Sequence, residues 1–240
     1  MNIIYLNPKS TGDVFMSARR KKEKFLTIEN RPELFPLNES QKQYMRAIIE
    51  NDMVCVMGPA GTGKTYIAAS MASRMYFDGE IDKIILTRPN VSPSESLGFF
   101  PGSINEKMAP WVAPFTDIIK QQLGAGCYET MLKNGNLEIA PFETMRGRSF
   151  NDAFIILDEA QNTRYKEIEM FVTRIGKNSR VIINGDIMQS DLDGGNGLYK
   201  IISMIDRRQL PIPIIEFNVE DIVRSPLCKM WIKAFLEEAQ

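Results

Sequence analysis

The 240-residue sequence predicts an α/β fold, in which helices on both faces cover a doubly wound, mostly parallel sheet. Three observations lead to this prediction. Short apolar runs alternate with helical patterns along most of the chain, as βαβ units require. A glycine-rich stretch, residues 58–65, stands between an apolar run and a helical pattern. The apolar run Ala153–Leu157 leads directly into two acidic residues, which places carboxylates at the carboxyl edge of such a sheet.

The elements of the N-terminal half follow from these patterns. In order, we expect a helix at 39–51, a strand at Met53–Met57, a helix at 64–77, a strand at Lys83–Thr87 and a helix at 105–123. Ser40 stands near the start of the first helix. Pro110 and Pro114 lie inside the last one, and because proline lacks an N–H donor they should break or bend it.

The C-terminal half continues the alternation. The expected strands are 136–140, Ala153–Leu157, 180–184 and 212–217, and the expected helices are 165–175, 197–205 and 227–238. Ala153–Leu157 is wholly apolar and is expected to be a buried central strand. Crossover helices between five or six strands give the doubly wound sheet.

Two segments of different character divide the chain. Residues 1–36 are expected to be an N-terminal extension, because they are polar and carry a basic cluster at Arg19, Arg20, Lys21, Lys22 and Lys24. Residues 37–240 are expected to form one domain, a size that suits a single large α/β unit.

Composition narrows the possible functions. The net charge is −1, so a nucleic-acid site would have to be a local patch. The absence of histidine excludes His-based catalysis and His-ligated metals. The cysteines Cys55, Cys127 and Cys228 match no zinc spacing or disulfide framework, which favours the cytoplasm. No apolar run is long enough to cross a membrane, so no membrane partner is expected.

The stretch GPAGTGKT predicts a phosphate-binding loop for ATP. Its residues are Gly58, Pro59, Ala60, Gly61, Thr62, Gly63, Lys64 and Thr65. Glycines let backbone N–H groups turn toward an anion at a helix N-terminus. Lys64 would reach the β- and γ-phosphates, and the Thr65 hydroxyl would ligate Mg²⁺. The alternative is a glycine-rich turn that holds no ligand.

Two further strand ends carry polar residues. In AFIILDEAQ, Asp158 can hold Mg²⁺ through water and Glu159 can orient or deprotonate the attacking water. The alternative is a strand that ends in an acidic helix cap. In NGDIMQ, Gln189 could contact the γ-phosphate, and the alternative there is an ordinary Gly-Asp turn.

These motifs resemble those of a known family. DEAQ with GD-x-x-Q resembles motifs II and III of superfamily 1 helicases, and Leu37-Asn38-x-x-Gln41 resembles the Q motif, whose glutamine reads adenine. More closely, the chain resembles PhoH-like P-loop ATPases. That resemblance rests on GPAGTGKTYIA, TRPNV, LGFFPGSINEKMAPW, MRGRSF, ILDEAQNT, TRIG, GDIMQSDL and DIVRSPL, spanning residues 37–235. It implies a single RecA-like domain, ATP hydrolysis and RNA or other nucleic-acid partners in a ring-shaped oligomer.

The resemblance also limits what is expected. Nothing before Leu37 matches the nuclease module fused to some relatives, so nuclease activity is not expected. The compact form resembles a phage-encoded version, which would act in the host cytoplasm.

A single RecA-like half lacks the arginines that a second domain would insert. Five arginines are candidates for the γ-phosphate, from this chain or a neighbouring subunit: Arg88, Arg146, Arg148, Arg174 and Arg224. The resemblance implies Arg224 near the γ-phosphate. Arg174 precedes Gly176, and its alternative role is a helix-capping surface residue.

The segment 90–108 is long for a βα connection and carries Phe99 and Phe100, with Trp111 nearby. Such aromatics either grip a single strand or pack under the loop. We expect an ATPase coupled to single-stranded nucleic acid, RNA rather than DNA, working as a helicase or remodelling motor in a hexameric ring. A nucleotide-dependent switch or phosphotransferase, and a non-catalytic ATP binder, are the alternatives.

Overall fold

The computed structural model describes residues 31–89, 104–187 and 196–238. Its six strands form one sheet in the order β3-β2-β4-β5-β1-β6, and every neighbouring pair is parallel. They are β1 (Met53–Met57), β2 (Lys83–Thr87), β3 (Leu137–Ile139), β4 (Ala153–Leu157), β5 (Arg180–Gly185) and β6 (Ile214–Glu216). The predicted α/β fold class is confirmed, and the sheet is wholly parallel.

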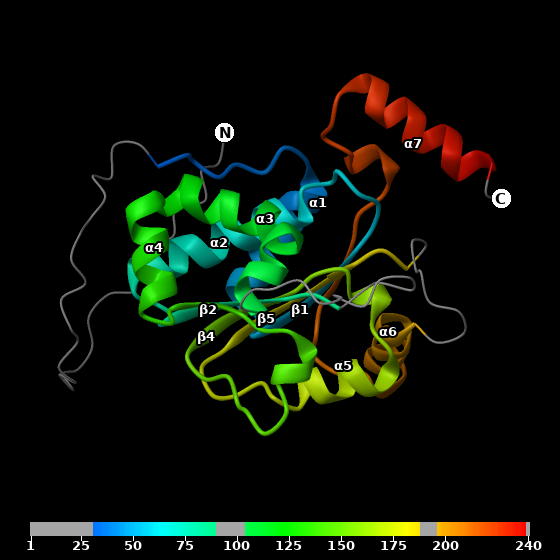
Figure 1. The fold of residues 1–240 in the computed structure, drawn as a ribbon. Helices are drawn as coiled ribbons and strands as arrows, with labels where there is room; N and C mark the ends of the chain where they lie inside the picture. The colour runs from blue at the N-terminus through cyan, green and yellow to red at the C-terminus, as the bar shows by residue number, and fades with distance from the viewer. Residues whose placement is uncertain (1–30, 90–103, 188–195, 239–240) are drawn as a thin grey trace.

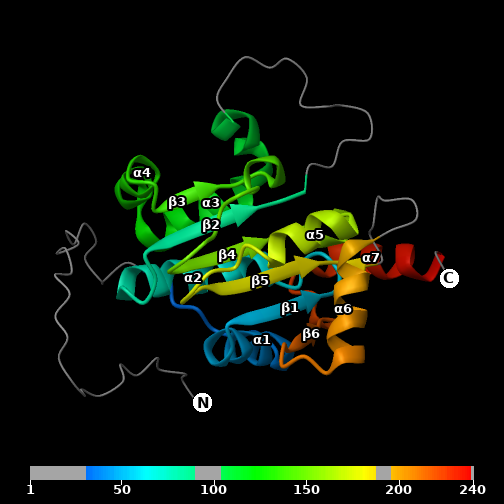
Figure 2. The ribbon, with the colours of Figure 1, turned by 90° about the horizontal axis from the view of Figure 1, so that it is seen from below.

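Helices lie on both faces of this sheet (Figures 1 and 2). They are α1 (Glu39–Glu50), α2 (Lys64–Asp78), α3 (Ile104–Leu123), α4 (Ala125–Lys133), α5 (Tyr165–Val172), α6 (Gly197–Arg208) and α7 (Pro226–Glu238). Helices α1 to α4 cover one face and α5 and α6 the other, while α7 stands out beyond the carboxyl ends of the strands. Among the described helices, none combines the length and hydropathy needed to cross a bilayer.

The strands supply two cores because their side chains alternate between the faces. From β4, Phe154 and Ile156 join the core under α1 to α4, whereas Ile155 and Leu157 join the core over α5 and α6. All five residues of β4 are buried, as expected for a central strand.

Helix α3 corrects one expectation. Pro110 and Pro114 do not break it, since α3 runs uninterrupted from Ile104 to Leu123; a bend at these prolines stays a prediction. An interior proline costs about 3 kcal/mol, and each fully buried large apolar side chain contributes about 1.5–3 kcal/mol. The buried apolar side chains of α3 are Val112, Phe115, Ile119 and Leu123. Their burial offsets the two prolines.

Several local details were not predicted. Helix α4 is an element of its own, and short 3₁₀ turns cover Phe142–Thr144, Ala160–Asn162 and Val219–Asp221. Asn38 is the N-cap of helix α1, and its side chain accepts a hydrogen bond from the Gln41 N–H at 2.8 Å. Leu34 is buried in the core on the α1–α4 face, so the described chain packs on the domain before residue 37.

Candidate nucleotide site

The carboxyl ends of β1, β4 and β5 surround a cavity of about 450 Å³. Parallel strands bring their carboxyl ends to one edge, where such sheets bind ligands. The cavity is lined by Ala60, Gly61, Gly63, Lys64, Thr65, Tyr66, Arg88, Pro114, Ile118, Asp158, Glu159, Asn184, Gly185, Asp186, Val223 and Arg224. The structure therefore brings the predicted phosphate loop, Asp158, Glu159 and Arg224 together.

Lys64 lies folded over its own loop. Its Nζ donates to the carbonyl oxygens of Gly58 at 2.6 Å and Pro59 at 2.8 Å. Burial lowers the pKa of Lys64, while Asp186, Asp158 and Glu159 oppose that shift. The loop carbonyls thus hold the ammonium at the place where the sequence predicts phosphates.

Asn184, to which the sequence motifs assign no role, contacts both predicted magnesium ligands, Thr65 and Asp158. The Asn184 side-chain amide donates to Asp158 Oδ1 at 2.8 Å and lies 3.4 Å from Thr65 Oγ1. Burial raises the pKa of Asp158 to about 6, with a smaller contribution from Glu159. A divalent cation would offset the cost of this buried carboxylate.

These residues fit a magnesium ion. A carboxylate and a hydroxyl are hard oxygen ligands, and Mg²⁺ typically takes one or two protein groups beside phosphates and water. The Asn184 Oδ1 atom is buried and has no hydrogen-bond partner among the described residues, so it can accept a bond from a metal-bound water. Among the described residues, no group of three or more Cys, Asp and Glu side chains is arranged to hold a metal ion.

Glu159 is oriented by its neighbours. The Gln161 Nε2 donates to Glu159 Oε2 at 2.6 Å, and Arg88 Nη2 lies 3.5 Å from Oε1. Gln161 is itself buried and accepts a hydrogen bond from the Asp186 N–H at 3.0 Å. One amide therefore connects the end of β4 to the end of β5 and positions the carboxylate.

Gln41 is buried against the phosphate loop. Its Nε2 donates to the Thr62 carbonyl at 2.9 Å, and its Oε1 accepts from the Leu37 N–H at 2.8 Å. A Cβ atom at Gly63, where φ is +90°, would lie 2.8 Å from Gln41 Nε2. Both ends of the amide are used within the chain, so its assignment to adenine stays a prediction.

The C-terminal segment closes over the loop. The Val223 N–H donates to the Gly61 carbonyl at 3.0 Å. A Cβ at Gly61, where φ is +85°, would lie 2.9 Å from the Arg224 side chain. Arg224 is therefore beside the phosphate loop of its own chain.

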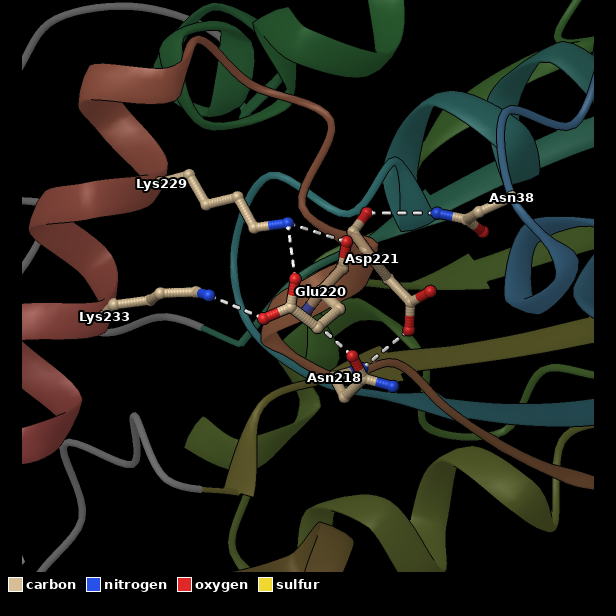
Figure 3. A network of polar contacts seen from close by, with 6 residues as sticks. All are labelled: Asn38, Asn218, Glu220, Asp221, Lys229 and Lys233. Carbon is tan, nitrogen blue, oxygen red and sulfur yellow. Dashed lines mark hydrogen bonds and ion pairs between the residues drawn. The ribbon is translucent and has the colours of Figure 1, made fainter.

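Polar contacts hold this segment in place (Figure 3). Asn38 Nδ2 donates to the Asp221 carbonyl at 3.2 Å, which ties it to the start of α1. Lys229 and Lys233 of α7 pair with Glu220 at 3.1 and 2.6 Å. These contacts join α7 to the segment that covers the phosphate loop.

Of the other candidate arginines, Arg88 lines this cavity, whereas Arg146, Arg148 and Arg174 do not. The backbone carbonyl of Arg174 accepts a hydrogen bond from the Phe150 N–H, which lies shortly before the start of β4. Arg148 pairs with Glu138 at 2.5 Å, and Arg146 is exposed. Gln189, Phe99 and Phe100 lie outside the described residues, as do the Trp111 side chain and the basic cluster of the N-terminal extension.

Comparison with known proteins decides the family. The family model described as "PhoH-like protein" matches residues 33–236. The chain belongs to the PhoH-like protein family. It is 45% identical over 197 residues to a PhoH-like protein of Bacillus subtilis, covering 81% of this chain and 61% of that one. It is 42% identical over 202 residues to Protein PhoH of Escherichia coli, covering 82% and 57%.

The chain thus spans about 60% of the length of these PhoH relatives. A crystal structure of Bacteroides sp. Pif1 with ADP-AlF4 aligns at 14% identity and a TM-score of 0.35, over 78% of this chain and 42% of that chain, a similarity too low to carry an argument. The PhoH assignment establishes a P-loop nucleotide-binding domain. A phage origin stays a prediction.

Proposed function

We propose that this PhoH-like protein is a magnesium-dependent ATPase coupled to single-stranded nucleic acid, with RNA favoured over DNA. It works as a helicase or remodelling motor in a ring-shaped homo-oligomer, a hexamer. Its place of action is the cytoplasm, or the host cytoplasm if the protein is phage-encoded.

One observation carries the hydrolytic part of this proposal: Glu159 lines the same cavity as Lys64, Thr65 and Asp158. A carboxylate beside a phosphate site can accept a proton from the attacking water. Its hydrogen bond from Gln161 orients it, and an oriented base has an advantage over a freely rotating one. A protein that only binds ATP has no use for this arrangement.

The remaining side chains have defined tasks. Lys64 would leave the loop carbonyls for the β- and γ-phosphates, and Arg224 would stabilise charge on the transferring group. Thr65 and Asp158 would hold Mg²⁺, which supplies neutralisation of phosphate charge when bound. Asn184 would hold the Asp158 carboxylate and the Thr65 hydroxyl at a fixed distance from each other.

The oligomeric part is supported by the exposed apolar side chains of α7. Leu227, Met230, Trp231 and Phe235 are between 55% and 69% exposed along α7, which stands away from the domain (Figure 1). Large exposed apolar faces mark contacts between proteins. In a closed ring, each subunit could bring such a face and a remote arginine to its neighbour. The nucleic-acid partner rests on the family resemblance and on the sequence of segment 90–108.

Phosphate release tests the proposal. ATP turnover should be measured with Mg²⁺ alone, with single-stranded RNA and with single-stranded DNA of the same length. We expect stimulation by both polymers and a larger effect of RNA. The same assay is run on Glu159→Gln, which should lose turnover because it lacks the proposed base. Glu129→Gln, on the exposed surface of α4, is the matched control and should keep wild-type turnover. Hydrolysis that neither polymer stimulates would leave an ATPase without the proposed coupling.

A further inference from the structure

Arg88 and Glu159 follow the carboxyl ends of two adjacent strands, one residue after β2 and two residues after β4. Thr87, the last residue of β2, is the register partner of Leu157, the last residue of β4. The Asp158 N–H then donates to the Thr87 carbonyl at 3.0 Å, so the backbones stay together beyond the strands. The sheet therefore brings the backbones of Arg88 and Glu159 close together.

Both oxygens of the Glu159 carboxylate have a partner from its own chain. Arg88 Nη2 is 3.5 Å from Oε1, and Gln161 Nε2 is 2.6 Å from Oε2. In this arrangement each carboxylate oxygen already contacts a side chain of the chain itself, where it could otherwise contact a water molecule.

The charges that line the cavity balance before any nucleotide enters. The cations are Lys64, Arg88 and Arg224, and the carboxylates are Asp158, Glu159 and Asp186. ATP with one Mg²⁺ adds about two negative charges, and bound ions change the local electrostatics of a site. A guanidinium in the cavity will then be drawn toward phosphate oxygens, which it can bind with two parallel hydrogen bonds.

The contact between Arg88 and Glu159 suits an exchange of partners. It is long, and the two side chains are 24% and 36% exposed. Ion pairs of this kind are weak, so a phosphate can displace the carboxylate. Arg224 lies over Gly61, whereas Arg88 is the cation that contacts the base.

We propose that Arg88 exchanges Glu159 for the γ-phosphate when ATP binds, and that this exchange frees Glu159 Oε1 to accept a hydrogen bond from the attacking water. The inference rests on the proposed ATPase function. In the step that follows, the water oxygen bonds to the γ-phosphorus and a water proton passes to Glu159. The bond from the γ-phosphorus to the β–γ bridging oxygen breaks, and its electron pair leaves with ADP.

The first test compares nucleotides that differ only in the γ-phosphate. Binding of ADP and of a non-hydrolysable ATP analogue is measured by calorimetry in Mg²⁺ for wild type, Arg88→Gln and Arg88→Lys. Arg88→Gln should weaken the ATP analogue about tenfold or more and leave ADP within about twofold, since a charge-assisted pair is lost. The affinity of Arg88→Lys for the ATP analogue should lie between those of wild type and Arg88→Gln. Arg46→Gln removes an exposed arginine that pairs with Glu50 and is the matched control.

The second test detects the exchange itself through a double-variant cycle. Glu159→Gln should tighten binding of the ATP analogue several-fold when Arg88 is present, because Arg88 no longer has to leave a carboxylate. The same change in the Arg88→Gln background should bring no gain. An equal gain in both backgrounds would reflect general repulsion and overturn the exchange.

The outcomes separate this inference from the proposed function. If wild type fails to hydrolyse ATP with or without nucleic acid, the proposed function is wrong. If wild type hydrolyses ATP but the preference for the ATP analogue over ADP is the same in Arg88→Gln, the role of Arg88 alone is overturned. Retained ADP binding in Arg88→Gln shows that the variant is folded.

Discussion

Asn184 donates its side-chain amide to the Asp158 carboxylate across 2.8 Å, from the end of β5 to the end of β4. The same amide lies 3.4 Å from the Thr65 hydroxyl. A side chain that holds a metal ligand in place typically changes metal affinity by about 10–100-fold when it is removed.

Asn184→Ala should therefore raise the Mg²⁺ concentration for half-maximal ATP turnover by about tenfold or more. The measurement is a magnesium titration of phosphate release at saturating ATP. Asn134→Ala, on the exposed end of α4, is the control. An unchanged magnesium requirement in Asn184→Ala would assign Asn184 a purely structural contact.

The buried Asp158 carboxylate predicts a dependence of stability on pH. Burial raises its pKa from 3.8 to about 6, so the folded protein binds this proton more tightly than the unfolded chain. The resulting stabilisation is fully present below about pH 4 and is lost as pH rises through about 6.

In the absence of Mg²⁺, Asp158→Asn should consequently raise the free energy of unfolding at pH 8 by on the order of 1–3 kcal/mol. At pH 4 the advantage should nearly vanish, because Asp158 is then protonated in the folded protein. Urea unfolding with a chelator at both pH values measures this. A destabilised variant at pH 8 would contradict it.

Lys64 and Glu159 should differ in what their removal costs. Lys64→Ala should weaken nucleotide binding and turnover together, because the ammonium contacts the phosphates of the ground state. Glu159→Gln should keep nucleotide binding, with the ATP analogue bound several-fold more tightly, but should lose turnover by roughly 10²-fold or more because the base is removed. Equal turnover in wild type and Glu159→Gln would take Glu159 out of the mechanism.

Gln41 is expected to influence both stability and the choice of base. Gln41→Ala leaves the Thr62 carbonyl and the Leu37 N–H without this partner, which should cost about 1–3 kcal/mol. It should also narrow the preference for ATP over GTP in a competition assay. A lower stability with an unchanged ratio of ATP to GTP affinity would show that Gln41 only stabilises the loop and does not recognise the base.

Arginine exchange between subunits can be tested by mixing. A Lys64→Ala subunit retains its arginines, and an Arg174→Ala subunit retains its phosphate loop. Each alone should lose about 10³-fold of its turnover if Arg174 acts in trans, and the mixture should recover part of it. At least one of Arg146, Arg148, Arg174 and Arg224 is expected to act in trans, so Arg146→Ala, Arg148→Ala and Arg224→Ala are mixed with the Lys64→Ala subunit in the same way. A fully active monomer in light scattering at assay concentrations would refute the ring.

The sequence predicts which residues stand at the strand ends, but it does not predict the side-chain contacts between neighbouring strands. GPAGTGKT and the run before Asp158 predict their positions because each motif is contiguous. The link from Asn184 to Asp158 and the pair of Arg88 with Glu159 depend on β4 lying between β2 and β5, a strand order that no local pattern encodes. The asparagine in NGDIMQ, a polar residue at the end of an apolar run, was the one signal available for Asn184.

Glu159 has φ +54° and ψ +39°, in the left-handed region that residues with a Cβ rarely occupy. Such a conformation costs about 1–2 kcal/mol, and glycine would adopt it without that cost. A change to glycine would relax the backbone and remove the carboxylate in the same step. At position 159 backbone conformation favours glycine, whereas the proposed reaction needs a carboxylate. Selection for thermostability alone would therefore be expected to replace Glu159 and lower ATP turnover.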